Sequence, residues 1–530
     1  MKITKILFLI IFILITTNYS GVEAQHIISL PKDKVEDKVK GGWVGKMIGV
    51  MYGREMEFKA TGVIYEGAIP WTPELIEKSL LEDDIYGQLN FMMTMERLGL
   101  DASVDSLAKN FANAEFPLCH ANLQSRKNHM DGISATESGK PENNMHADDI
   151  DFQIESDFIG FINPCMPQSS NKLCQKIGSI MAYGDGLYSG MYISSMHSNA
   201  YNGRDIEGIV TNALKSLPQK SAYALCIKEV LSAYHQDPTD WRKAWKKIQQ
   251  TWGNIDICAP YHPFDIDAKL NGSFVTIGLL YGGGDFKKTM EITIRCGQDT
   301  DCNTSNVAAV LGVINGYKAI PNDLKSYIPE IADKNFLHTN YSYNKVVKQT
   351  IAFIDENVIR NGGSVGKDIY FIKSQSPAAP KLKQGFKNIR MAYQVQVKDK
   401  ASWKFDDGWT DFVYGDGDND LYALSIKPGA TAEIDFTGIG ISLLGSWNVD
   451  AGKAKVYIDN VFIKEIDTYY REEAGKYDVN RAYLFHQFGL KKGNHTLKII
   501  VSENKNQHSS GNKLYIERII AYKTIDKENS

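Results

Sequence analysis

Two short acidic segments, far apart in the chain, carry the residue types best suited to bind a metal ion. The run Glu82-Asp83-Asp84 directly precedes a stretch with helical periodicity, and Asp299 and Asp301 stand two residues apart before another such stretch. Hard divalent cations prefer oxygen ligands, and Mg²⁺ needs only a few carboxylates together with water. If the fold brings the two segments together, they can hold a pair of ions. For each segment alone, helix capping or an acidic turn is the alternative.

The segments that must position these acids have helical periodicity from about residue 35 to about residue 355, which predicts a large all-α domain. One helix is predicted to begin after Asp84, and another runs from Asn306 and ends at Gly316. Near the start of this region a glycine occupies every fourth position: Gly41, Gly45, Gly49 and Gly53. Each costs about 1 kcal/mol of helix stability relative to Ala. The ladder therefore predicts that another backbone approaches this helix closely.

The periodicity changes near residue 390. Ile439, Ile441 and Leu443 alternate with other residues, as expected for strands, and some 130 residues of short strands with turn signals predict a β-sandwich. Asp459-Asn460 is predicted to be a hairpin turn, and Lys492-Gly493-Asn494 another turn. Between the two regions, the segment 374–380 contains two prolines and reads as the start of a linker.

The N-terminus has the order typical of a cleavable secretory signal. Lys2 and Lys5 precede an apolar run, 6–15, which is shorter than the about 20 residues that a membrane span needs. An uncleaved anchor is the alternative. We therefore expect a signal peptide at 1–24, an all-α catalytic domain at 25–373, a linker at 374–389 and a carbohydrate-binding-like β-sandwich at 390–526. Without a second candidate span, we expect an exported protein, periplasmic or secreted.

Charge and cysteine content narrow the classes of function. The net charge of -4 over 530 residues, without a dense basic patch, argues against a nucleic-acid partner. Seven cysteines leave at least one unpaired, and no CxxC zinc spacing occurs. Cys165 and Cys174 could form a disulfide, a pairing that the sequence does not establish. Buried thiols are the favoured interpretation for most of the seven.

Five segments, in order between about residues 40 and 320, resemble the motifs of the ADP-ribosylglycohydrolase family. They are an opening helix from Gly42 to Glu57, the run Glu82-Asp83-Asp84, the segment Ser156–Gly160 with Asn163-Pro164, the segment Asp185–Met191, and the stretch from Gly282 to Asp301. The resemblance implies an all-α fold that binds Mg²⁺ or Mn²⁺, with two ions expected. It also implies that Asp83, Asp84, Asp299 and Asp301 are the metal ligands and that Glu57 lies close to them.

Two positions depart from the family pattern. Members that act on ADP-ribosylated proteins usually carry Thr where this chain has Glu82, and Thr again where it has Cys302. A thiol is a soft ligand and a poor partner for Mg²⁺, so Cys302 is interpreted as a packing residue. Glu82 then takes the place of the missing hydroxyl, as ligand or as base. These departures favour a substrate other than ADP-ribose.

The expected reaction is hydrolysis of a glycosidic bond, which passes through an oxocarbenium-like transition state. Glu82, Glu57 and Asp157 are the candidate catalytic acids and bases, with helix capping as the alternative for Asp157. Tyr188 and Asn271 are candidate substrate-binding residues, for which ordinary packing is the alternative. His146, within Met145–Asp149, invites assignment as a metal ligand; we interpret it as a surface or hydrogen-bonded histidine because no second imidazole is near in sequence.

The C-terminal region resembles galactose-binding-like carbohydrate modules through weak patterns such as Asp435–Gly438 and Gly493–Leu497. Its Trp403, Trp409, Trp447, Tyr469 and Tyr470 are candidates for stacking on sugars, although buried aromatic residues are commoner. Three hypotheses follow: a metal-dependent glycosidic hydrolase acting on an extracellular or periplasmic glycan, an ADP-ribosyl hydrolase acting on protein or small-molecule substrates, or a carbohydrate-binding protein without activity.

Overall fold

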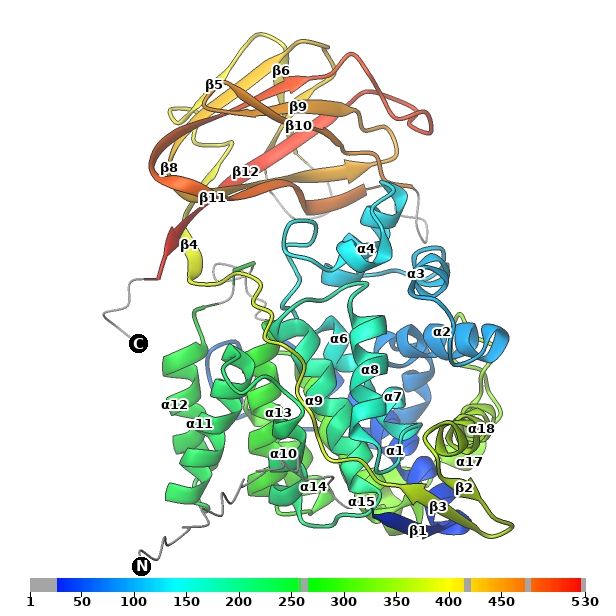
Figure 1. The fold of residues 1–530 in the computed structure, drawn as a ribbon. Coiled ribbons are helices and arrows are strands. Elements are labelled where there is room, and N and C mark those ends of the chain that lie inside the picture. Colours follow the sequence, from blue (N-terminus) through cyan, green and yellow to red (C-terminus); the bar gives the residue numbers. More distant parts are fainter. Residues whose placement is uncertain (1–25, 256, 259–265, 414–420, 472–477, 526–530) are drawn as a thin grey trace, which may run out of the picture.

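Helical periodicity in the first two thirds of the chain and alternation in the last third produce two regions stacked end to end (Figure 1). The computed structural model describes residues 26–255, 257–258, 266–413, 421–471 and 478–525. The predicted signal peptide at 1–24 lies outside the described residues. The described regions confirm the predicted fold class, a large all-α domain followed by a C-terminal β-sandwich. No helix in these ranges is both long and apolar enough to cross a bilayer.

The helical region consists of α-helices of about one to six turns, with 3₁₀ segments between some of them. Its elements are α1 (Lys32–Arg54), η1 (Pro73–Leu81), α2 (Asp83–Leu98), α3 (Val104–Ala112), α4 (His120–Met130), α5 (Ala135–Ser138), α6 (Asp151–Ile154), α7 (Asp157–Phe161), α8 (Pro167–Gly178), α9 (Asp185–Ala200), α10 (Ile206–Lys215), α11 (Ala222–Gln236), α12 (Trp241–Trp252), α13 (Ala268–Gly282), α14 (Phe286–Arg295), α15 (Thr300–Asn315), η2 (Tyr317–Ala319), α16 (Asn322–Lys325), α17 (Ile328–Ile331) and α18 (Tyr343–Arg360).

The glycine ladder brings α1 against α15. A Cβ at Gly45 would lie 2.2 Å from the Ala308 carbonyl oxygen, and one at Gly53 would lie 2.3 Å from that of Thr300. Real Cβ atoms do not come so close, so only glycine permits this packing. The predicted close approach is thereby confirmed. Its consequence is that the C-terminal end of α1, at Arg54, lies beside the N-terminal end of α15.

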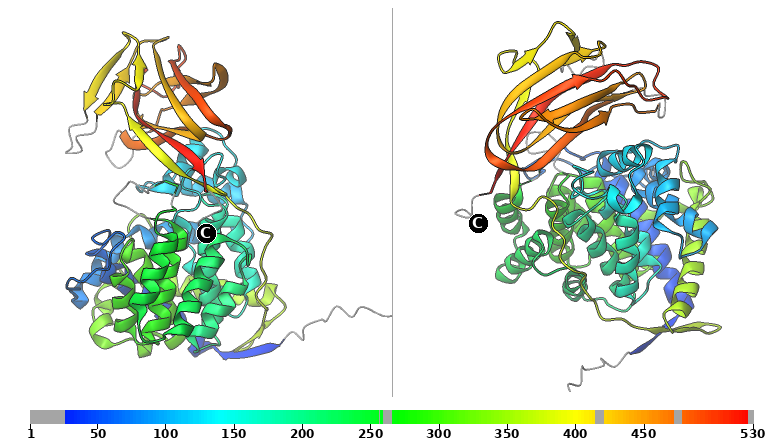
Figure 2. Two further views of the ribbon diagram at one scale, coloured as in Figure 1. Left: turned by 90° about the vertical axis from the view of Figure 1, so that its left-hand side faces the viewer. Right: turned by 45° about the horizontal axis from the view of Figure 1, so that its top comes forward.

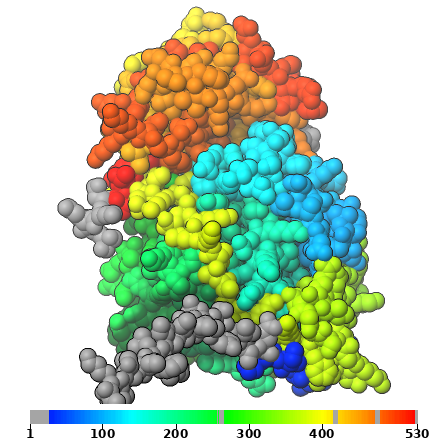
Figure 3. Space-filling model, in the orientation of Figure 1, coloured from blue at the N-terminus to red at the C-terminus, as the bar shows by residue number. Residues whose placement is uncertain are grey.

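A three-stranded sheet ties the beginning of the helical region to its end. It has the order β1 (Ile27–Pro31), β3 (Ile369–Lys373), β2 (Ser364–Val365). From there the chain climbs the surface of the helices to the sandwich, visible as the yellow track in Figure 3. Asn171 Nδ2 donates to the Ala378 carbonyl oxygen at 3.0 Å, so part of the predicted linker is packed against the helices.

Antiparallel strands build the C-terminal region. They are β4 (Ile389–Gln396), β5 (Trp403–Phe405), β6 (Trp409–Val413), β7 (Leu421–Ser425), β8 (Thr431–Asn448), β9 (Lys453–Ile458), β10 (Val461–Asp467), β11 (Asp478–Val501) and β12 (Leu514–Thr524). Long strands β8 and β11 pair along most of their length, and the sheet follows the order β10-β9-β11-β8-β12-β7-β6.

One of the two predicted turns is confirmed and the other is wrong. Asp459 and Asn460 both have positive φ, 53° and 63°, and join β9 to β10 as a hairpin. Lys492-Gly493-Asn494 instead lies inside β11, beside a register shift between Phe488 and Gly493. Strand β11 continues through this segment because it pairs with β8 on both sides of the register shift. The residues predicted as a turn therefore lie beside a bulge.

Most of the candidate stacking residues in the sandwich are packed in its interior. Trp403, Trp447 and Tyr470 are buried, while Trp409 and Tyr469 are half-buried. The indole of Trp447 stacks on the Tyr470 ring with centroids 5.9 Å apart. All seven cysteines are free thiols, so the pair Cys165 and Cys174 is not a disulfide.

The sandwich sits on the end of the helical region that carries α4 and the loop before α6 (Figure 2). Tyr483 on β11 donates its hydroxyl to the Cys258 carbonyl oxygen at 3.1 Å. His486 lies 2.8 Å from the Pro141 carbonyl oxygen. Arg471 donates to the Ala112 carbonyl oxygen at 2.9 Å. These contacts fix the sheet over one end of the helices.

Candidate functional site

A cavity of about 340 Å³ opens where the end of α1 meets the starts of α2 and α15. Its walls carry an unusual concentration of carboxyl groups. They are Glu57, Glu82, Asp83, Asp84, Asp151, Glu155, Asp299 and Asp301. The two acidic segments predicted to converge do so here, across more than 200 positions of sequence.

Helix starts place these acids. Glu82 is the N-cap residue of α2, with Asp83 and Asp84 in its first turn. Asp299 is the N-cap residue of α15, and Asp301 lies in its first turn. The partial positive charge of a helix N-terminus favours acids at such positions, which is why the sequence resembles ordinary capping. The glycine packing of α1 against α15 adds Arg54 and Glu57 from the end of a third helix.

Arg54 is the cation that contacts several of these acids. Its guanidinium forms an ion pair with Glu57, lies 3.5 Å from a Glu82 carboxylate oxygen, and lies 3.3 Å from Asp301 Oδ2. Burial raises the pKa of Glu57 to about 8, with the Asp301 charge adding to the effect of burial. Burial likewise raises the pKa of Glu82 to about 7, against the opposing effect of Arg54. The positive charge of the Arg54 guanidinium therefore does not balance the carboxyl groups that line this cavity.

The donors fit a hard divalent cation. Carboxylate oxygens of Asp299 and Asp301 lie within 4.8 Å of each other, with the Cys302 sulfur beside them, and it is these oxygens that suit such an ion. Asp299 Oδ1 is buried without a hydrogen-bond partner among the described residues. Burial and the neighbouring charge of Asp301 raise the pKa of Asp299. A cation would supply both the missing charge and the missing contact for oxygen ligands of this kind.

Cys302 lies at the edge of this oxygen cluster. Its Sγ donates to Asp84 Oδ2 at 3.4 Å, and burial, followed by the charges of Asp299 and Asp84, raises the pKa of the thiol. The protonated sulfur thus acts as a hydrogen-bond donor to a carboxylate. This role agrees with its interpretation as a packing residue.

Asp84 links the cavity to a buried charge cluster behind it. Lys46 Nζ lies 3.6 Å from Asp84 Oδ1 and donates to Asp157 Oδ2 at 2.8 Å. His197 Nε2 lies 2.7 Å from the other Asp157 oxygen, and the Asn306 amide donates to both of them. Asp157 is fully buried and does not line the cavity. It is therefore placed to act through Lys46 and Asp84.

The two predicted substrate-binding residues lie apart from the carboxylates. Tyr188 exchanges hydrogen bonds with the backbone of Lys383 in the connection to the sandwich. Asn271 is buried in α13, where its Oδ1 accepts from Asn303 Nδ2 at 2.7 Å. Neither residue lines the carboxylate cavity.

Sequence reasoning missed Asp151 and Glu155, which line the same cavity from α6 and its C-terminal end. The backbone N–H of Asn122 donates to Asp151 Oδ1 at 3.1 Å, and its side-chain amide donates to Glu155 Oε1 at 2.9 Å. Burial raises the pKa of Asp151 to about 7. The acid-rich stretch Asp148–Glu155 was the available signal, but its spacing does not show which acids face a cavity.

Comparisons with known proteins identify the family of the helical region. The model of the ADP-ribosylglycohydrolase family matches residues 31–347, which include every carboxylate of the cavity. A search of curated protein sequences found no match. Among solved structures, a chain of an ADP-ribosylglycohydrolase-related protein complex is 12% identical, with 61% of this chain and 99% of that chain covered and a TM-score of 0.44.

Other solved structures resemble smaller parts of the chain. A two-domain esterase active on acetylated mannans is 16% identical over 36% of this chain and 50% of its own, with a TM-score of 0.21. A family 35 carbohydrate-binding module from Clostridium thermocellum is 11% identical over 24% of this chain and 97% of its own, with a TM-score of 0.17.

Proposed function

Because the chain belongs to the ADP-ribosylglycohydrolase family, whose members are hydrolases, we propose that it is a divalent-metal-dependent glycosidic hydrolase acting on an extracellular or periplasmic glycan. The observation that carries the proposal is the cavity at the ends of α1, α2 and α15. Carboxyl groups crowd there around a single guanidinium, and an oxygen of Asp299 lacks a partner among the described residues.

In this proposal Asp83, Asp84, Asp299 and Asp301 hold Mg²⁺ or Mn²⁺, with two ions expected. When bound, such ions polarise an oxygen of the substrate or of water and neutralise developing negative charge. Arg54 keeps Glu57 and Glu82 together at the cavity wall, because its guanidinium contacts both carboxyl groups. Lys46 holds Asp84 from behind, with Asp157 fixing the position of Lys46.

The proton transfers fall to the two glutamates. In hydrolysis, a water oxygen forms a bond to the anomeric carbon while the bond from that carbon to the leaving oxygen breaks. Glu82, with a pKa of about 7, accepts the proton of the attacking water when ionised. Glu57, whose pKa is raised by burial, donates a proton to the leaving oxygen when it is protonated. Water and the glycoside are fully accounted for in the two products.

Two further features support a glycan over an ADP-ribosylated protein. The first is the presence of Glu82 and Cys302 in place of two threonines. The second is the β-sandwich fixed over the helices, which resembles carbohydrate-binding modules in its sequence patterns. Export, proposed from the N-terminal charge and apolar pattern, would place the protein where such glycans occur.

The test is a product screen with the purified chain and Mg²⁺ or Mn²⁺. Oligosaccharides and ADP-ribosylarginine are supplied in parallel, and released sugar or ADP-ribose is measured. We expect sugar release that stops on chelation and falls by about a thousandfold in Glu82→Gln and Asp299→Asn. Asp323→Asn is the matched control, because Asp323 is an exposed acid paired with Lys287.

Release of ADP-ribose alone would replace the glycan by an ADP-ribosyl substrate. Full activity in both Glu82→Gln and Asp299→Asn would overturn the site. Sugar affinity without turnover, in protein free of bound metal by elemental analysis, would leave the non-catalytic carbohydrate-binding hypothesis.

A further inference from the structure

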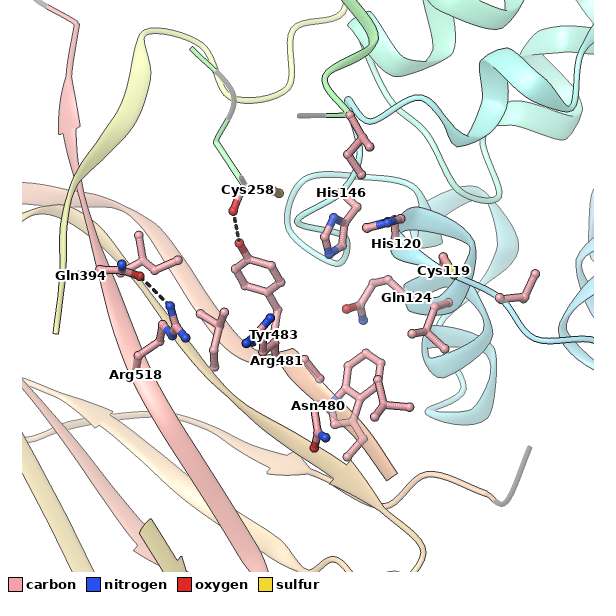
Figure 4. A pocket seen from close by; sticks show the side chains of 18 of the residues that line it. Cys119, His120, Gln124, His146, Cys258, Gln394, Asn480, Arg481, Tyr483 and Arg518 are labelled. Atoms are coloured by element: carbon pink, nitrogen blue, oxygen red, sulfur yellow. Dashed lines mark hydrogen bonds between the residues drawn. The ribbon is translucent and has the colours of Figure 1, made fainter. Parts of the chain in front are cut away.

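A second cavity of about 340 Å³ lies between the helical region and the sandwich (Figure 4). Gln124, His120 and His146 face it from the helical side, and Tyr483 and Arg518 face it from the sheet. It shares wall residues, His120 among them, with the carboxylate cavity. In contrast to that cavity, it is lined by imidazole and guanidinium groups and by no carboxylate of the described residues.

The two imidazoles belong to a compact cluster with Asp149. Ligand atoms of His120, His146 and Asp149 all lie within 4.8 Å of one another. His146 Nδ1 is 2.6 Å from Asp149 Oδ2, and the two imidazole rings have centroids 5.5 Å apart. His146 is distant from His120 in sequence, which explains why it looked like a lone histidine.

Hydrogen bonds fix the position of the segment that carries His120 relative to the segment that carries His146. The buried amide of Asn144 donates to the Ala121 carbonyl oxygen at 3.1 Å and accepts from the His146 backbone N–H at 2.9 Å. The Asp149 N–H donates to the His146 carbonyl oxygen at 3.0 Å. His120 itself has a φ of 46°, a strained conformation for a residue with a side chain. The cluster is therefore preorganised by its surroundings.

The acids adjacent to the cluster are paired with a lysine. The adjacent acids Asp148 and Asp267 both pair with Lys269, whose Nζ is 3.3 Å from Asp148 Oδ2.

We propose that His120, His146 and Asp149 bind a divalent transition-metal cation such as Zn²⁺, at a site separate from the carboxylate cavity. Two imidazoles and one carboxylate form a ligand set typical of such ions, whereas Mg²⁺ prefers oxygen ligands alone. In tetrahedral geometry, bond lengths of about 2.0–2.2 Å would place adjacent ligand atoms about 3.4 Å apart. Entry of the ion thus requires the 2.6 Å contact between His146 and Asp149 to lengthen by about 0.8 Å.

The open coordination positions of this ion would face the cavity between the regions, because His120 and His146 line it while Asp149 is buried behind them. The Tyr483 ring packs edge-on against the His146 ring, with centroids 5.3 Å apart. The sandwich therefore forms the opposite wall of the site. A water molecule or a substrate oxygen in the cavity would complete the coordination.

The test uses the full chain, freed of metal with a chelator and then held in excess Mg²⁺ so that oxygen-ligand sites are occupied. Co²⁺ is added as a probe whose visible absorption reports its ligands, and Zn²⁺ is added in competition. We expect one Co²⁺ per chain with a nitrogen-ligand spectrum, displaced by Zn²⁺. His120→Ala and His146→Ala should each weaken Co²⁺ binding by about a hundredfold.

The matched control is His235→Ala. His235 also pairs with a carboxylate, Glu207 at 2.6 Å, but on the open surface. Asp299→Asn should leave Co²⁺ binding unchanged, which separates this site from the carboxylate cavity. Circular dichroism confirms folding, and His146→Gln, a milder change, should weaken binding as well. Absence of a nitrogen-ligand Co²⁺ signal in wild type, or equal affinity in the His146 and His235 variants, would overturn the proposal.

Discussion

One buried carboxylate, Asp157, and the carboxyl groups of the cavity lie on either side of Asp84, and they differ in how their charge is compensated. Around Asp157, a lysine ammonium, an imidazole and an amide surround one carboxylate. Burial alone would raise the pKa of Asp157, but the Lys46 charge and the His197 hydrogen bond outweigh it and lower the pKa to about 2. In the adjoining cavity, burial and mutual repulsion raise the pKa of Glu57, Glu82 and Asp299.

The difference teaches how to separate structural acids from functional ones. A carboxylate with a full set of partners stabilises the fold, whereas a cluster without them costs stability until a ligand arrives. Asp157 and Asp299 both lie at helix starts. Only the neighbours that folding supplies distinguish Asp157 from Asp299.

The largest expected effect concerns the compensated acid. Asp157→Asn should lower the free energy of unfolding by about 3 kcal/mol, because it leaves the Lys46 ammonium buried without its closest anion. Asp299→Asn in metal-free protein is the matched variant, and it should leave stability unchanged or higher because it removes a crowded carboxylate. Chemical unfolding of both variants measures the change in the free energy of unfolding. Equal destabilisation by the two substitutions would contradict the difference in charge compensation.

The second prediction uses pH to expose the uncompensated group. Glu57 and Glu82 have pKa values of about 8 and 7 in the fold, against 4.5 for an ordinary Glu. The folded state thus binds more protons than the unfolded state between these values, so stability falls as pH rises from about 5 to about 8. Metal-free protein should lose about 2–5 °C in melting temperature over this range.

Added Mg²⁺ should remove most of that loss, because it compensates the ionised carboxylates. A melting temperature that is flat with pH, or equally sensitive with and without Mg²⁺, would contradict the assignment. The compensated acid has the opposite sign: the folded-state pKa of Asp157 lies below the ordinary 3.8. Its stabilising contribution is therefore complete above about pH 4 and is lost as pH falls through 2.

The smallest effect tests the packing that brings the cavity together. A Cβ at Gly49 would lie 2.4 Å from the Thr304 carbonyl oxygen, so Gly49→Ala must push α1 away from α15. Overpacking costs about 1–3 kcal/mol, partly offset by the better helix propensity of Ala, which leaves about 1 kcal/mol of net destabilisation. Ser106→Ala, at a half-buried position in the first turn of α3, serves as the control.

Thermal unfolding reports the stability of Gly49→Ala, and activity reports the geometry of the cavity. We expect a larger loss of activity than the small loss of stability would cause. A variant more stable than wild type would show that the two helices have room to approach.

Much of the site followed from local sequence. Glu57, Glu82 and the four aspartates proposed as ligands all line one cavity. The glycine ladder predicted the close packing of α1 and α15 that brings them together. Tyr188 and Asn271 lie elsewhere, and Asp157 lies behind the cavity wall. Asp151 and Glu155 were missed because an acidic residue in a short helix carries no local sign of which way it faces.

The sequence by itself determined the two regions, the positions of a few helices and the acidic segments, because periodicity, capping residues and glycine spacing are local properties. Only the tertiary structure decided which acids are compensated and that His120 lies beside His146. It also decided that the sandwich covers one end of the helices. These outcomes depend on contacts between residues far apart in the chain, and such contacts set the charge, burial and geometry from which the chemistry follows.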